Sequence, residues 1–178
     1  MSNVDGGPML SVLAVVLSAS LSLPSASYSN AALLTSANRH VRTTDRYVQQ
    51  LLAEGLDRSP TLHALMGGLE ATDVIVYIQP VSELPGTVAG RLLMVPYGGT
   101  GRYLRIQVAL GRSPSEMIGL IGHELRHALE IAEARDVRNE KDLVMLYERI
   151  GDRSHEALHQ YDTAAARLTG QRVQRELV

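Results

Sequence analysis

Residues 121–130 read Ile-Gly-His-Glu-Leu-Arg-His-Ala-Leu-Glu, and the interpretation of the whole chain starts from this stretch. It lies within a segment that predicts one long helix, running from Ser113 or Ser115 to about Ala134. Ser113 is a natural N-cap, and Pro114 suits the first helical turn because its missing N–H needs no partner there.

The predicted helix has two different sides. Apolar residues recur at helical spacing along one of them, namely Met117, Ile118, Ile121, Leu125, Ala128, Leu129 and Ala132. His123, His127 and Glu130 fall on nearly the opposite side. The sequence therefore predicts a helix that packs with its apolar stripe and presents two imidazoles away from it.

The pattern His-Glu-x-x-His at 123–127 carries a specific chemistry. Residues four apart lie one turn above each other, so His123 and His127 can bind one metal ion. Glu124 lies about 100° further round the helix, where it can reach a water on that ion but cannot bind the ion with the histidine pair. Zinc lowers the pKa of such a water, and Glu124 can then accept its proton as a general base.

A catalytic zinc ion usually has three protein ligands, so a third is expected beyond the two histidines. Asp152 to about Leu177 predicts the last helix, whose packing face comprises Leu158, Tyr161, Ala165, Leu168 and Thr169. Asp162 falls within that face, and a buried carboxylate is costly unless it is paired or bound to metal. Asp162 is therefore the favoured third ligand, with Glu130, Glu156 and His159 as open alternatives. Glu130 is also expected to orient His127 or a neighbour.

The middle of the chain predicts strands rather than helices. Residues 73–79, 88–95 and 103–110 are rich in β-branched and aromatic residues, with a glycine-rich turn at 97–101 between the last two. Strict alternation in 103–110 predicts one buried face, and its strand edge is a candidate binding site for an extended peptide. Further helices are expected at 36–56, after Ser59-Pro60 until Gly67-Gly68, and at 136–150. The predicted fold class is α+β, a small antiparallel or mixed sheet packed on helices.

Composition restricts the possible functions of the chain. It has 178 residues and a formal net charge of −2, so it offers no basic field for a nucleic acid. It has no cysteine, which excludes disulfides, thiolate zinc sites and cysteine nucleophiles. Any metal ion must therefore be bound by His, Asp or Glu.

The beginning of the chain has the features of a secretory signal. Residues 9–23 form an apolar run that is too short to span a membrane, and a small-x-small pattern follows at 25–27. We expect a signal peptide at residues 1–27 and a single domain at 28–178. The mature protein is then exported, to a periplasm or outside the cell, without a stable membrane span.

The motif and its surroundings resemble the zincin metallopeptidases, in particular the gluzincin-like type. The matching residues are 121–130 on the first helix and Asp162-Thr-Ala-Ala165 on the later one, where the family usually has Glu followed by Ala three residues on. The resemblance covers residues 70–178. It implies zinc held by His123, His127 and a carboxylate, with peptide or protein as the substrate and Glu124 as general base.

Two other functions are compatible with the pattern. A di-iron carboxylate protein of the four-helix-bundle type uses Glu-x-x-His pairs, and Glu124-His127 and Glu156-His159 both have that spacing. That architecture needs two more inward glutamates on further long helices, where this chain predicts strands. The second alternative is a non-enzymatic exported binding domain on a zincin-like scaffold, which has no evident need for Glu124.

Overall fold

The computed structural model describes residues 40–86, 88–96, 99, 101–151 and 162–178. The elements in chain order are β1 (Val41–Arg42), α2 (Arg46–Arg58), α3 (Pro60–Glu70), β2 (Val74–Val81), β3 (Gly90–Val95), β4 (Arg102–Ala109), α4 (Pro114–Glu133), α5 (Glu140–Ile150) and α6 (Ala164–Glu176). The predicted α+β class is confirmed. The expected signal peptide at 1–27 lies outside the described residues.

The four strands form one mixed sheet in the order β1-β2-β4-β3. β1 and β4 both pair with β2 in parallel, whereas β3 and β4 are antiparallel, as the glycine-rich turn between them predicted. The prediction of a free edge on residues 103–110 is wrong, because β4 has a partner on either side. The edge of the sheet next to α4 belongs instead to β3.

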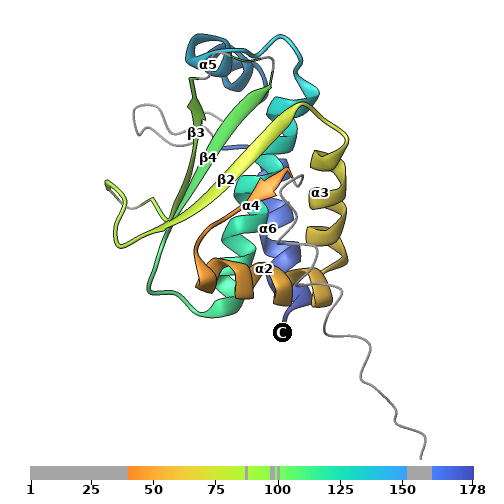
Figure 1. Ribbon diagram of the computed structural model, residues 1–178, viewed down its shortest axis with the longest axis vertical. Helices are drawn as coiled ribbons and strands as arrows, with labels where there is room; N and C mark the ends of the chain where they lie inside the picture. The colour runs from red at the N-terminus through yellow and green to blue at the C-terminus, as the bar shows by residue number, and fades with distance from the viewer. Residues whose placement is uncertain (1–39, 87, 97–98, 100, 152–161) are drawn as a thin grey trace, which may run out of the picture.

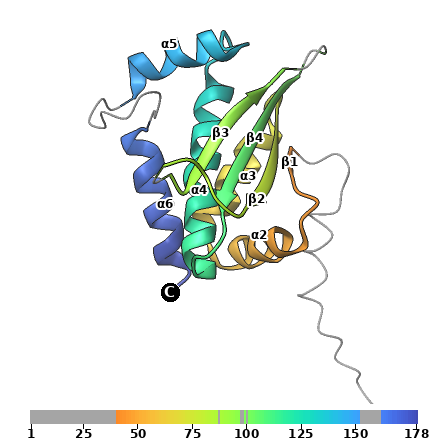
Figure 2. The same cartoon turned by 90° about the vertical axis from the view of Figure 1, so that its left-hand side faces the viewer.

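Helices cover one face of this sheet, and α4 lies between the sheet and α6 (Figures 1 and 2). The apolar stripe predicted for α4 faces the sheet and α3, and six of its seven residues are buried, with Leu129 partly buried. The inward residues of the strands complete the core, among them Val76, Leu104 and Ile106. No helix in the described part of the chain is long and apolar enough to cross a membrane.

Several helix boundaries agree with the signals in the sequence. Ser113 caps α4 in a capping box with Glu116, and Ser59 caps α3 with Pro60 at its first position. The helix predicted from residue 136 begins only at Glu140, because Asn139 caps it.

Gly67 and Gly68 do not end α3, which continues to Glu70. Each glycine costs a helix about 1 kcal/mol relative to alanine, but the neighbouring residues Leu65 and Leu69 are buried in the core. Tertiary packing therefore outweighs the local preference.

The last helix differs most from its prediction. α6 begins at Ala164, because the Thr163 side chain accepts a hydrogen bond from the N–H of Ala166 and caps the helix. The predicted packing face is wrong in its described part: Leu168 is 62% exposed, whereas the face that packs comprises Ala166, Gly170 and Val173. Leu158 and Tyr161 lie outside the described residues.

The reason for the different face is the close approach of α6 to α4. A Cβ added at Gly170 would lie 2.9 Å from the carbonyl oxygen of Gly119 and 3.0 Å from the Cβ of His123. A Cβ added at Gly122 would lie 2.9 Å from a methyl group of Val173. Glycines thus replace the large apolar residues that the sequence pattern favoured, and they let α6 lie directly against the histidine side of α4.

Arg102 fixes the far end of α4. Its side chain is buried, and it donates hydrogen bonds to the carbonyl oxygens of Ile131 at 2.5 Å, Ala132 at 3.0 Å and Ala134 at 2.9 Å. It also binds the Asp73 carboxylate at 2.5 Å, which joins the start of β2 to the end of α4. One cation therefore pairs with two of the last four carbonyl groups of the helix and with that of its C-cap residue.

Replacement of Arg102 by methionine is expected to lower the free energy of unfolding by on the order of 3 kcal/mol, because it leaves buried carbonyl groups without donors. Chemical denaturation measures the change. Arg138→Met is the matched control, since the Arg138 side chain binds the same Asp73 carboxylate at 3.0 Å but is 53% exposed. The control is expected to change stability by less than about 1 kcal/mol. An equal loss of unfolding free energy in the two variants would contradict the role given to Arg102.

Candidate metal centre

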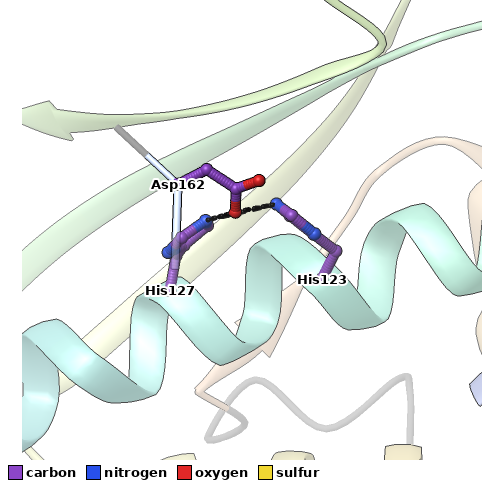
Figure 3. Close-up of side chains that lie close together, drawn as sticks. All are labelled: His123, His127 and Asp162. Atoms are coloured by element: carbon purple, nitrogen blue, oxygen red, sulfur yellow. Dashed lines mark hydrogen bonds and ion pairs between the residues drawn. The ribbon is translucent and has the colours of Figure 1, made fainter. Parts of the chain in front are cut away.

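Three side chains converge on one point beside α4. His123 and His127 extend from successive turns of the helix, and Asp162 reaches them from the residues before α6 (Figure 3). The two imidazole Nε2 atoms are 3.2 Å apart. One carboxylate oxygen of Asp162, Oδ1, lies 3.5 Å from Nε2 of His123 and 3.7 Å from Nε2 of His127.

These three distances fit the dimensions of a zinc site. Atoms separated by 3.2, 3.5 and 3.7 Å have a common centre about 2.0 Å from each, which is the usual length of zinc–nitrogen and zinc–oxygen bonds. Tetrahedral ligands with bonds of that length are about 3.3 Å apart. Two imidazoles and one carboxylate also match the ligand types of catalytic zinc, and they leave a fourth position open. The group can therefore hold a metal ion.

Asp162 reaches the histidines from a position that differs from the prediction. It precedes the N-cap of α6 instead of lying on a packed helical face, and its side chain is 28% exposed. Arg167 binds its other oxygen, Oδ2, at 3.2 Å, and the N–H of Thr163 donates to Oδ1 at 2.7 Å. These two contacts orient the carboxylate so that Oδ1 faces both imidazoles.

His127 is held from behind by two side chains. Its Nδ1 lies 2.9 Å from Oε2 of Glu130 and 3.1 Å from the hydroxyl of Tyr147 on α5. A carboxylate only accepts, so Nδ1 donates its proton to Glu130, and Nε2 is the nitrogen that would bind a metal ion. The expected role of Glu130 in orienting His127 is supported by this contact. Tyr147 was not anticipated, because its position on a separate helix follows from tertiary packing alone.

The ionisable groups of the centre influence one another strongly. Burial and the charge of His127 lower the pKa of His123. Burial also acts to lower the pKa of His127, but its interactions with the carboxylates of Asp162 and Glu130 outweigh burial and raise this pKa. For Asp162, burial is outweighed by the interaction with His127 and the charge of His123, which hold its pKa well below the usual range. Asp162 is therefore anionic at neutral pH.

Glu124 is buried beside this centre, with only 5% of its surface exposed. Burial raises its pKa to about 7, while the charge of His127 lowers it and that of Asp162 raises it. Within the described residues its carboxylate has no hydrogen bond or ion pair with another side chain. A Cβ added at Gly90, the first residue of β3, would lie 2.6 Å from Oε1 of Glu124. Glycine at this position lets the backbone of the edge strand lie directly against the carboxylate.

The other candidate residues have separate positions. Glu130 binds the outer nitrogen of His127 and does not face the point shared by the three ligand atoms. Glu156 and His159 lie outside the described residues. The four-helix bundle of a di-iron protein is contradicted, because the middle of the chain forms a mixed sheet.

Comparisons with known proteins give no match that bears on this centre. No family model matches the chain, and no curated protein or solved structure matches it either. The resemblance to zincins therefore rests on the sequence motif alone, and the structure adds a carboxylate from a later part of the chain near both histidines.

Proposed function

We propose that this protein is a zinc-dependent peptidase, with His123, His127 and Asp162 as the metal ligands and Glu124 as the general base. The observation that carries the proposal is the triangle of Nε2, Nε2 and Oδ1 atoms, with sides of 3.2 to 3.7 Å, next to a buried carboxylate. A histidine pair on a solvated helix surface needs neither a third ligand nor a buried glutamate.

The chemical role of each side chain follows from its position. His123, His127 and Asp162 would hold the zinc ion, which when bound would lower the pKa of a coordinated water towards neutrality. Glu124, with a pKa of about 7, is suited to accept a proton from the attacking water and to return it to the leaving amine. Burial keeps this carboxylate away from bulk solvent, and the absence of a side-chain partner in the described residues leaves it ready to accept.

The edge of β3 supports peptide as the substrate class. β3 is paired with β4 on one side only within the described residues, and Gly90 places its beginning against Glu124. An extended peptide that adds to this edge through backbone hydrogen bonds passes beside the general base. Backbone recognition of this kind selects for an extended conformation and depends little on side chains.

Asp162→Asn is expected to weaken zinc binding by about 100-fold or more, which exceeds the 10- to 100-fold effect typical of residues that only support a ligand. The substitution keeps the shape of the side chain and removes its charge. Competition with a chromophoric chelator measures the dissociation constant. Asp136→Asn is the control, since Asp136 is exposed and outside the site. Unchanged affinity in Asp162→Asn would remove Asp162 from the ligand set.

Glu124→Gln is expected to lower the rate of peptide hydrolysis by about 10²- to 10⁴-fold, because glutamine cannot accept the proton of the attacking water. Zinc affinity is expected to stay within a few-fold of the wild type, since Glu124 is not a ligand. A peptide library analysed by mass spectrometry provides the assay without assuming a sequence preference. Glu133→Gln, on the same helix and 59% exposed, is the matched control.

The same assay separates the enzyme from the alternative of a binding domain. Cleavage by the wild type that persists in Glu124→Gln would contradict the role of Glu124. Zinc binding without cleavage of any peptide, unaltered by the substitution, would favour a non-enzymatic binding domain.

A further inference from the structure

We propose that Glu130 and Thr163 are positioning residues that join the two halves of the metal centre, so that His127 and Asp162 are brought into place together. The inference rests on the proposed metal site and adds the hydrogen bonds that bring its two halves together. The two halves are separate in the chain, because Glu130 belongs to α4 and Thr163 is the N-cap of α6.

Glu130 divides its two carboxylate oxygens between these halves. Oε2 lies 2.9 Å from Nδ1 of His127, and Oε1 accepts a hydrogen bond from the Thr163 hydroxyl at 2.8 Å. The second contact joins residues 33 positions apart. One carboxylate therefore fixes the ring orientation of a metal ligand and also ties α4 to the beginning of α6.

Thr163 passes this constraint on to Asp162. Its hydroxyl donates to Glu130 and also accepts from the N–H of Ala166 at 3.0 Å, which holds the side chain in one rotamer. Its own N–H donates to Oδ1 of Asp162 at 2.7 Å, and Oδ1 is the atom that faces both histidines. The hydrogen bonds thus run without a gap from His127 through Glu130 and Thr163 to Asp162.

Burial makes these contacts hard to replace. Glu130 is 6% exposed, Thr163 4% and His127 5%, so water has little access to take over a lost partner. Arg126 approaches Glu130 only at 3.6 Å, and its side chain is 25% exposed. A buried carboxylate with two specific donors has one preferred position, and this rigidity is what a metal site with three ligands from two elements needs.

The two residues can be tested through metal binding alone. Glu130→Gln keeps the shape of the side chain but removes its charge, and its single accepting oxygen cannot accept from both Nδ1 of His127 and the Thr163 hydroxyl. Thr163→Val keeps the shape and loses the hydroxyl, whereas Thr163→Ser retains it. Each of the first two variants is expected to bind zinc about 10- to 100-fold more weakly than the wild type. Thr163→Ser and the exposed control Glu133→Gln are expected to stay within a few-fold.

The double variant Glu130→Gln/Thr163→Val distinguishes one connected device from two independent effects. If the residues act together, its loss of zinc affinity equals roughly that of the more impaired single variant. A loss of zinc affinity equal to the product of the two single-variant losses would overturn the proposal, because it would mean that Thr163 acts only as the cap of α6. Cobalt replaces zinc for a second measurement, in which the visible absorption of the bound ion reports ligand geometry. Altered absorption is expected for Glu130→Gln, and an unaltered spectrum would contradict its positioning role.

Failure of this inference is distinguishable from failure of the proposed function. A wild-type protein that binds neither zinc nor cobalt stoichiometrically contradicts the metal site itself. A wild type that binds both, with Glu130→Gln and Thr163→Val binding as tightly, contradicts only the coupling. Circular dichroism of each variant shows whether it is folded, and only folded variants enter the comparison.

Discussion

Burial of three ionisable side chains on α4 is the constraint from which the rest of the site follows. Glu124, His127 and Glu130 are each 5 or 6% exposed, and desolvation of such groups is costly unless partners offset it. His127 and Glu130 offset it through each other and through residues of α5 and α6. The packing of these helices therefore depends on the polar network. A substitution that disrupts either one is expected to disturb the other.

The close contact between α4 and α6 makes this network possible. Small residues at Gly119, Gly122 and Gly170 let the two helices approach until a backbone atom of one meets the side chains of the other. Arg102 holds the opposite end of α4 against the sheet. Between these ends, Glu130 and Tyr147 add hydrogen bonds that orient the ring of His127. Sites built on such rigid elements hold their geometry better than sites on loops.

Much of the fold could be predicted because its signals are local. The cap at Ser113, the proline after it and the apolar spacing that follows define α4 within a few residues of its observed limits. The alternation in residues 103–110 identified the buried side of β4, where Leu104, Ile106 and Val108 are fully buried. The pairing of His123 with His127 also required only the period of a helix.

What could not be predicted depends on contacts between distant residues. The sequence pattern places Asp162 on a packed helical face, yet the residue lies before α6 and is oriented by Arg167 and Thr163. The residue lies near both histidines, as the prediction requires, but it does not lie on a packed helical face, because Thr163 caps α6 and the helix begins after it. The sheet edge was assigned to β4 because strand order is not visible in a single strand. Tyr147 had no signal in the sequence, as its contact with His127 joins two helices.

The proposed site binds one metal ion where His123, His127 and Asp162 converge. Anomalous diffraction on either side of the zinc absorption edge, from crystals grown with one equivalent of zinc, locates the ion directly. A single strong peak is expected within about 2.2 Å of Nε2 of His123, Nε2 of His127 and Oδ1 of Asp162. A peak held by a different set of residues, or zinc-loaded crystals without a peak at this point, would contradict it.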